Sequence, residues 1–226
     1  MKPIRNSLRA LSRLLSYPDT EVRQQLAMLL TALEDETALS QARCNELKTL
    51  VTYLLNLDPM DAEARYVETF DRGRATCLHL FEHVHGDSRD RGPAMIDLTK
   101  TYEQSGLLLS PDELPDHLCV VLEFASTQTP EVAKDFLGEM AHILNAIFSA
   151  LLNRESPSAM VIAALLDLTG HKAQAVTLAV EQSLDESWSE PEAFDGCSTR
   201  GQARPSEPQP INFVRKTSTQ TRGVIA

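Results

Sequence analysis

Apolar residues recur at helical spacing along most of the chain. Ile4, Leu8, Leu11 and Leu15 share one face of a first predicted helix, which ends before Tyr17 and Pro18. The same three- and four-residue spacing continues to about residue 183. No two segments with alternating apolar and polar residues are joined by a turn signal, so a pair of β-strands is not predicted. The pattern therefore predicts an all-α protein.

Polar residues followed by proline mark the starts of several predicted helices. Asp58-Pro59, Thr129-Pro130 and Ser156-Pro157 each place a capping side chain before a proline in the first helical position. Residues 110–113 have the sequence of a capping box, which Pro115 limits to one short turn. The predicted helices cover approximately residues 4–15, 18–33, 47–55, 58–73, 77–84, 93–106, 115–125, 129–151, 156–170 and 171–183.

The periodic pattern ends near residue 184. From Asp185 onward, prolines, glycines, serines and threonines replace it, which is typical of a disordered segment. We therefore expect one helical domain, residues 1–184, and a disordered tail, residues 185–226. The predicted fold is a single-domain bundle of about nine to ten helices, without internal repeats.

Composition agrees with a folded protein and excludes one class of partner. Of the 226 residues, 42% are hydrophobic and 23% are charged, as in ordinary globular domains. The 32 acidic residues outnumber the 21 basic ones and give a net charge of −11. Such a chain repels a phosphate backbone, so we expect no nucleic-acid partner.

Neither export nor membrane insertion is expected. No apolar segment follows the basic residues at the start of the chain, so a signal peptide is not predicted. The longest apolar run extends only from Met160 to Leu166, whereas a membrane-spanning helix needs roughly 20 residues. The four cysteines form no CxxC pair and are interpreted as reduced thiols. These features predict a soluble, cytoplasmic protein.

One motif points to metal chemistry. His79, Glu82 and His83 match the H-x-x-E-H arrangement, in which two histidines hold zinc and the glutamate acts as a base. A zinc-dependent hydrolase also needs a third protein ligand, and no spacing in this chain identifies one. We favour ordinary hydrogen-bonded histidines on a helix face. The chain also lacks a Gly-rich phosphate loop and a G-x-S-x-G elbow, so catalysis has little support.

Arginines and aspartates alternate in two glycine-containing segments, residues 71–74 and 87–92. Their arginines, with the start of the helix at Pro93, are suited to bind a phosphate or a partner's carboxylate. The alternative, which we favour, is an internal ion-pair network that fixes the loop to a helix.

Residues 113–118 place an acid and a histidine side by side at a proline-led helix start. Asp116 and His117 have the composition of a titrating switch. We favour the simpler interpretation, in which Asp116 stabilises the N-terminus of its own helix and His117 is partly exposed.

Several of these segments together resemble one family. Residues 66–74 (YVETFDRGR), 80–92 (LFEHVHGDSRDRG) and 94–98 (AMIDL) are similar to the signature region of the NarJ family of nitrate reductase assembly chaperones. Residues 113–118 and 122–124 resemble that family's second signature, and residues 12–18 and 58–61 resemble its opening segments. The resemblance covers roughly residues 4–184.

The resemblance implies a non-enzymatic, all-helical chaperone of nitrate assimilation, related to TorD and DmsD, with no resident cofactor. Such a protein binds the N-terminal region of the nitrate reductase alpha subunit, alone or in an alpha–beta complex. It keeps that subunit cytoplasmic until molybdenum cofactor is inserted, and cofactor biosynthesis proteins are further candidate partners. The residues assigned to the client-binding groove or its supporting shell are Asp71, Arg72, Glu82, His83, His85, Arg89, Arg91, Asp116 and His117.

Two other functions remain open at this level. One is the zinc hydrolase built on His79, Glu82 and His83. The other is a direct carrier of the molybdenum cofactor, whose phosphates would be held by arginines. The arginines concerned are Arg72, Arg74, Arg89 and Arg91.

Overall fold

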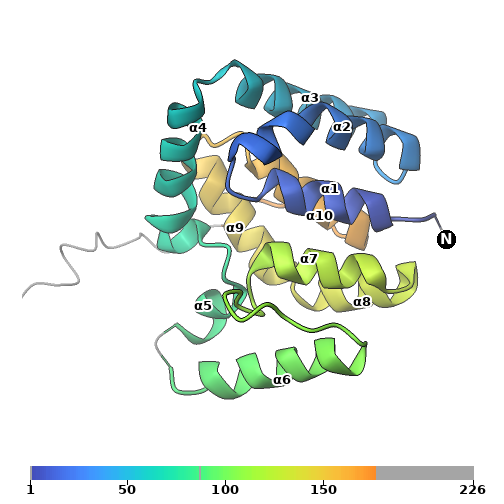
Figure 1. Ribbon diagram of the computed structural model, residues 1–226, viewed down its shortest axis with the longest axis vertical. Helices are drawn as coiled ribbons and strands as arrows, with labels where there is room; N and C mark the ends of the chain where they lie inside the picture. The colour runs from blue at the N-terminus through green and yellow to red at the C-terminus, as the bar shows by residue number, and fades with distance from the viewer. Residues whose placement is uncertain (1, 87, 177–226) are drawn as a thin grey trace, which may run out of the picture. The chain divides into compact units, whose positions relative to one another are not determined.

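A computed structural model describes residues 2–86 and 88–176 (Figure 1). The chain divides into two compact units, Met1–Glu181 and Gln182–Ala226, and every described residue belongs to the first. The tail predicted to be disordered, residues 185–226, lies outside the described residues, as does most of the helix predicted at 171–183. Residues 171–176, which are described, are not helical.

The all-α prediction is confirmed. The described residues contain helices and one isolated β-bridge, between His79 and His117, and no strands. A π-helix, η1 (Val67–Asp71), continues α4, and a short 3₁₀ helix, η2 (Arg74–Thr76), follows it. The α-helices are α1 (Arg5–Leu14), α2 (Thr20–Glu36), α3 (Gln41–Asn56), α4 (Pro59–Tyr66), α5 (Leu80–His85), α6 (Arg91–Gln104), α7 (Leu118–Thr127), α8 (Pro130–Glu139), α9 (Ala141–Asn153) and α10 (Ala159–Thr169).

Side-chain caps fix several helix starts. The Asp58 carboxylate accepts a hydrogen bond from the Met60 amide at 2.9 Å, and Thr129 caps α8 in the same way. The start of α2 differs slightly from the prediction. Pro18 does not open it, because Asp19 is its N-cap and accepts from the Val22 amide at 2.8 Å.

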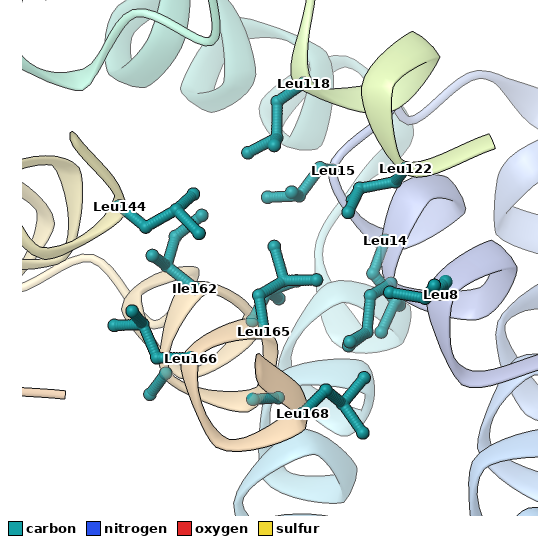
Figure 2. Close-up of a cluster of buried hydrophobic side chains, with 14 of the residues drawn as sticks. Leu8, Leu14, Leu15, Leu118, Leu122, Leu144, Ile162, Leu165, Leu166 and Leu168 are labelled. Carbon is teal, nitrogen blue, oxygen red and sulfur yellow. The ribbon is translucent and has the colours of Figure 1, made fainter. Parts of the chain in front are cut away.

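The main hydrophobic core lies where α1, α7 and α10 meet (Figures 1 and 2). Leucines from all three helices point into it, and α10 is buried on nearly all sides. Burying a leucine contributes about 1.5–3 kcal/mol, so this region dominates the stability of the unit. The most deeply buried of these residues include Leu8, Leu11, Leu118, Leu122, Ile162 and Leu165.

A second, smaller cluster holds α6. Leu98 and Tyr102 of α6 are buried against Phe124 of α7. The Tyr102 and Phe124 ring centroids are 4.6 Å apart, and Phe136 of α8 packs at 5.1 Å from Phe124. Figure 1 shows α6 at the edge of the unit, beside α7 and α8. This small cluster supplies the buried apolar contacts of α6.

The predicted long helix at 129–151 is wrong, because it is broken into α8 and α9. The two helices meet at Met140 with a bend of 66°. Both bury their apolar stripes, so the hydrophobic periodicity continues through the bend and does not reveal it. No single described helix is long and apolar enough to cross a membrane. Together, α8 and α9 have the length and the apolar composition of such a span, but they are bent relative to each other.

Three helix starts were also predicted about three residues too early. Ser156-Pro157 does not open α10, which begins at Ala159 after Ser158 and without a side-chain cap. The other two errors share one reason. The helix expected over 77–84 begins only at Leu80, and the one expected from Pro115 begins only at Leu118. The Leu118 amide donates to the Leu78 carbonyl at 2.8 Å, and the Leu80 amide donates to the Asp116 carbonyl at 3.0 Å. These bonds hold both segments extended, and residues 110–113 form only a turn.

Candidate functional site

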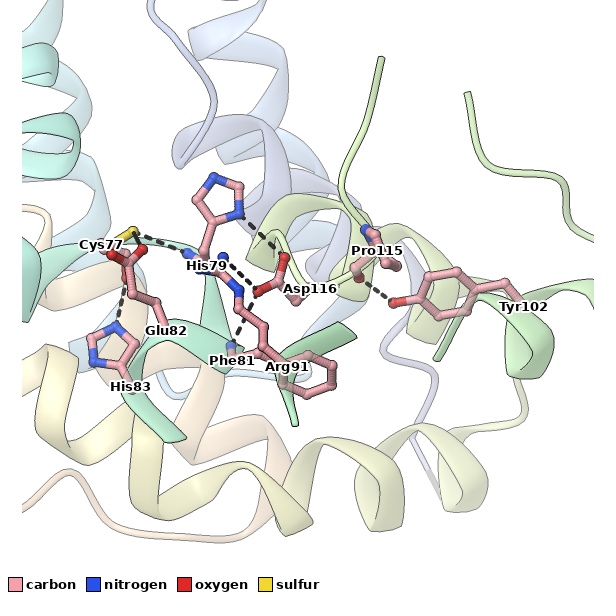
Figure 3. Close-up of polar contacts among 9 residues, drawn as sticks. All are labelled: Cys77, His79, Phe81, Glu82, His83, Arg91, Tyr102, Pro115 and Asp116. Carbon is pink, nitrogen blue, oxygen red and sulfur yellow. Dashed lines mark hydrogen bonds and ion pairs between the residues drawn. The ribbon is translucent and has the colours of Figure 1, made fainter. Parts of the chain in front are cut away.

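Asp116 lies at the centre of the signature segments. Its side chain is 0% exposed. One carboxylate oxygen accepts from the Phe81 amide at 3.2 Å and lies 3.6 Å from the Arg91 guanidinium; the other lies 3.3 Å from His79 Nδ1 (Figure 3). We call Asp116, His79, Phe81 and Arg91 the Asp116 cluster. The cluster supplies this buried carboxylate with the partners that it needs.

The Asp116 cluster joins three helices. Phe81 is in the first turn of α5, Arg91 begins α6, and Asp116 lies just before α7. Asp116 therefore caps α5, which is distant in the sequence. The prediction that Asp116 stabilises the start of its own helix, α7, is wrong. The neighbouring Pro115 carbonyl accepts from the Tyr102 hydroxyl at 2.7 Å, which ties the far end of α6 to the same point.

Of the two interpretations of the arginine-rich segments, the internal ion pair applies to Arg91, which contacts the buried Asp116. Arg72 pairs with Glu68 on the surface at 3.4 Å. Arg89 is exposed, and Asp87 lies outside the described residues. Two of the arginines considered for a cofactor carrier are thus engaged with different carboxylates.

His117 packs beside the Asp116 cluster. Its ring centroid is 5.0 Å from that of His79. Burial lowers the pKa of His117, and the neighbouring His79 acts in the same direction, although Asp116 and Asp71 oppose them. His117 is partly exposed, as predicted, and its lowered pKa favours the neutral form at neutral pH.

The proposed zinc residues do not share a helix face. His79 precedes α5 in an extended conformation, whereas His83 lies within α5. His79 contacts Asp116, while His83 Nε2 lies 2.8 Å from the Cys77 carbonyl oxygen. Across residues 2–86 and 88–176, no group of three or more His, Cys, Asp or Glu side chains is placed to hold a metal ion. The geometry required by H-x-x-E-H is therefore not formed.

Cys77 is an inert thiol in this arrangement. It donates to Glu82 Oε2 at 3.1 Å. Burial raises its pKa to about 11, and the bond to Glu82 acts in the same direction. Since the thiolate is the reactive form, nucleophilic chemistry at Cys77 is disfavoured at neutral pH.

Three of the predicted site residues line one small cavity of about 250 Å³. These are Asp71, Glu82 and His117, and the cavity is completed by residues that were not predicted, including Tyr66 and Phe70. The other predicted residues lie elsewhere. Asp116 is fully buried, and the His85 and Phe81 ring centroids are 5.7 Å apart.

A larger, more apolar cavity of about 460 Å³ lies on another face of α7, and the sequence did not predict it. The one sequence feature that could have indicated this cavity is the run of three leucines at 107–109, which follows Gly106 and has no helical periodicity. We call this cavity the leucine groove. It is lined by Arg9, Arg13, Tyr102, Leu107, Leu108, Leu109, Glu113, Val120, Glu123, Phe124, Ser126 and Thr127.

Comparison with known proteins identifies the family. Residues 17–156 match the family model described as nitrate reductase delta subunit. The nitrate reductase molybdenum cofactor assembly chaperone NarJ of Escherichia coli K12 is 42% identical over 185 residues, covering 81% of this chain and 78% of NarJ. NarW of the same strain is 39% identical over 81% of this chain and 80% of its own length.

A third relative is much longer than this chain. The nitrate reductase-like protein NarX of Mycobacterium tuberculosis is 36% identical over 68% of this chain, but only 23% of NarX is covered. The NarJ and NarW matches decide the family, because they are long and have high identity. Both include the signature segments around Asp116. The chain therefore belongs to the NarJ family of nitrate reductase molybdenum cofactor assembly chaperones and is not an enzyme.

Proposed function

We propose that this protein binds the N-terminal region of the respiratory nitrate reductase alpha subunit. It keeps that subunit in the cytoplasm and competent for molybdenum cofactor insertion before membrane attachment, and it is absent from the finished enzyme. The observation that carries the proposal is the 42% identity to E. coli NarJ over 81% of the chain.

NarX supports the choice of partner. In that protein a region similar to this chain is part of one long nitrate reductase-like polypeptide. Covalent linkage keeps two units together at high effective concentration, which suits units that act on each other. In the present chain, the same association is made by reversible binding.

Helix recognition is the physical basis of the proposed binding. A helical bundle with an apolar groove can bind an amphipathic client helix through anchors spaced i, i+3, i+4 and i+7. Micromolar affinity corresponds to about 8 kcal/mol, which sequesters a subunit yet permits release. Release follows when the loaded client folds and buries the same segment, because folding then competes with binding.

The signature residues support this binding mainly by positioning. The Asp116 cluster fixes α5 and α6 against α7, and Asp71, Glu82 and His117 shape the small cavity beside it. We assign Arg72, His83, His85 and Arg89 to the surrounding shell, together with Arg91 and Asp116 as its structural centre. Proteins of molybdenum cofactor synthesis are expected to meet the chaperone–client complex at this stage.

Isothermal titration calorimetry tests the proposal directly. The purified full chain is titrated with a synthetic peptide of the alpha subunit's N-terminal segment from the same organism. We expect a 1:1 complex of roughly micromolar affinity. A scrambled peptide of identical composition is the control. If neither peptide binds, or both bind equally, the proposal is wrong.

A genetic experiment tests the role in cells. Deletion of the gene and of any paralogue should leave nitrate reductase without molybdenum cofactor, and a plasmid copy should restore the cofactor content. Normal cofactor content in the deletion strain would contradict the proposed role.

A further inference from the structure

We propose that a cavity beside α4 is a binding site for a small aromatic compound that carries a negatively charged group. The cavity has a volume of about 410 Å³ and is lined by residues from the ends of α1 and α3, from α4 and η1, and from the segment between α9 and α10. We call it the α4 cavity. It shares no lining residue with the leucine groove, and the inference does not depend on client binding.

The α4 cavity has the size and the apolar lining of a small-molecule site. Cavities that hold small ligands usually measure about 300–1,000 Å³ and are lined mainly by apolar side chains. Among the lining residues, Leu14, Pro18 and Phe70 are buried, and Leu54 and Leu57 at the end of α3 are half-buried. The apolar part of a ligand would therefore leave water on entering the cavity, which favours binding.

Aromatic rings in the lining favour an aromatic ligand. Tyr53 of α3 and Tyr66 of α4 both line the cavity, and the ring centroids of Tyr66 and Phe70 are 4.9 Å apart. Aromatic pairs in stacked or edge-to-face contact are stabilised beyond the burial of their surfaces. A flat aromatic ligand can make such contacts with several rings of the lining.

Two arginines indicate that the ligand carries a negative charge. Arg65 and Arg154 line the cavity and are exposed, and neither forms an ion pair within residues 2–86 and 88–176. The Arg65 guanidinium lies 5.9 Å from the centroid of the Tyr53 ring, and Arg154 uses Nη1 to donate to the carbonyls of Glu68 and Thr69. Both guanidinium groups therefore keep N–H donors for a carboxylate, a sulfonate or a phosphate.

The other polar residues of the lining leave this positive charge in excess. Of the two acidic residues, Glu68 is paired with Arg72, so Glu155 alone opposes the two arginines. The hydroxyl groups of Ser156 and Ser158 form no hydrogen bond with the described residues, although Ser158 occupies the N-cap position of α10. These hydroxyl groups are further donors for an anion.

The α4 cavity adjoins the signature segments. Tyr66 and Phe70 line both this cavity and the small cavity that His117 lines. Phe70 belongs to η1, and π-helices are rare and often occur at functional sites. A ligand in the α4 cavity would therefore contact residues that also shape the small cavity.

Two related dyes test the inference on the full chain. Anilinonaphthalene sulfonate has an aromatic body and one negative charge, whereas phenylnaphthylamine has the same rings and no charge. Both dyes fluoresce strongly in apolar surroundings. In a fluorescence titration, we expect Arg65→Gln to weaken the sulfonate at least about ten-fold, because a charge-assisted hydrogen bond is lost. The affinity for the uncharged dye should stay the same.

Two further variants serve as controls. Arg65→Lys keeps the positive charge and should bind the sulfonate more tightly than Arg65→Gln does. Arg5→Gln removes an exposed arginine of α1 that lines no cavity described above, and it should bind both dyes as the wild-type protein does. Circular dichroism verifies that all variants are folded.

Several results would overturn the inference. The wild-type protein might bind no sulfonate dye, or Arg65→Gln might bind it as tightly as the wild-type protein does. An equal loss of both dyes in Arg65→Gln would show an apolar cavity without anion recognition. Loss of the sulfonate in Leu108→Glu, with normal binding by Arg65→Gln, would place the dye in the leucine groove instead.

Discussion

Asp116 combines complete burial with an ionisable side chain, and its partners explain why this is tolerated. The carboxylate accepts a backbone hydrogen bond at the start of α5 and contacts Arg91 and His79, which are 29% and 30% exposed. An isolated buried carboxylate is costly, whereas one with several donors is stable. The sequence identified Asp116 and Arg91 as candidates, but their partners could not be predicted because they lie on distant segments.

Replacing Asp116 should destabilise the protein strongly. Asp116→Ala leaves the Phe81 amide and the partly buried Arg91 without an acceptor, and we expect a loss of about 2–4 kcal/mol in the free energy of unfolding. Urea denaturation measures it. Arg72→Ala is the control, since its pair with Glu68 is exposed, and it should change stability by less than about 0.5 kcal/mol. Equal effects of the two substitutions would show that the Asp116 cluster is unimportant.

At the scale of elements, local sequence signals placed most helices but missed the irregular joints. Asp58-Pro59 correctly marked the start of α4, and the predicted end near Gly73 falls just after η1. The close packing there was not predicted. Arg154, the residue after α9, donates to the carbonyls of Glu68 and Thr69 and so holds η1 in place.

Gly73 should be required at this joint. A Cβ at Gly73 would meet the Thr76 hydroxyl, Arg154 Nη1 at 2.6 Å and the Thr69 carbonyl oxygen at 2.9 Å. We expect Gly73→Ala to lower the free energy of unfolding by about 1–3 kcal/mol, because backbone atoms must move. Thermal and urea unfolding measure this effect.

Gly92 provides the matched glycine control. It lies in the first turn of α6, and a Cβ there would meet nothing within 4 Å. Gly92→Ala should leave stability unchanged or raise it by up to about 1 kcal/mol, since alanine favours helix. A stable Gly73→Ala variant would contradict the packing described at the end of η1.

At the scale of the whole unit, two hydrophobic clusters differ greatly in size. The main cluster joins most helices, whereas the smaller one has only Leu98, Tyr102 and Phe124 as buried members. Regions with few buried apolar contacts open at lower free energy than the rest of a domain. Helix α6 is therefore the element that we expect to open most readily.

Hydrogen exchange should reveal this difference. We expect the amides of α6 to exchange at least about ten-fold faster than those of α1, α7 and α10, which corresponds to an opening free energy lower by about 1.4 kcal/mol. Mass spectrometry of peptic fragments provides the measurement, and α10 is the internal reference. Uniform protection across these helices would show that α6 is as firmly held as the core.

The sequence by itself determined the helical class, most helix positions and the family, because each depends on local spacing, capping residues or contiguous motifs. Only the tertiary structure decided the bend at Met140, the late starts of α5 and α7, and the cap that Asp116 provides to α5. The leucine groove also belongs to this second group. These features depend on contacts between segments far apart in the chain, and a periodic pattern carries no information about which distant residue will be the partner.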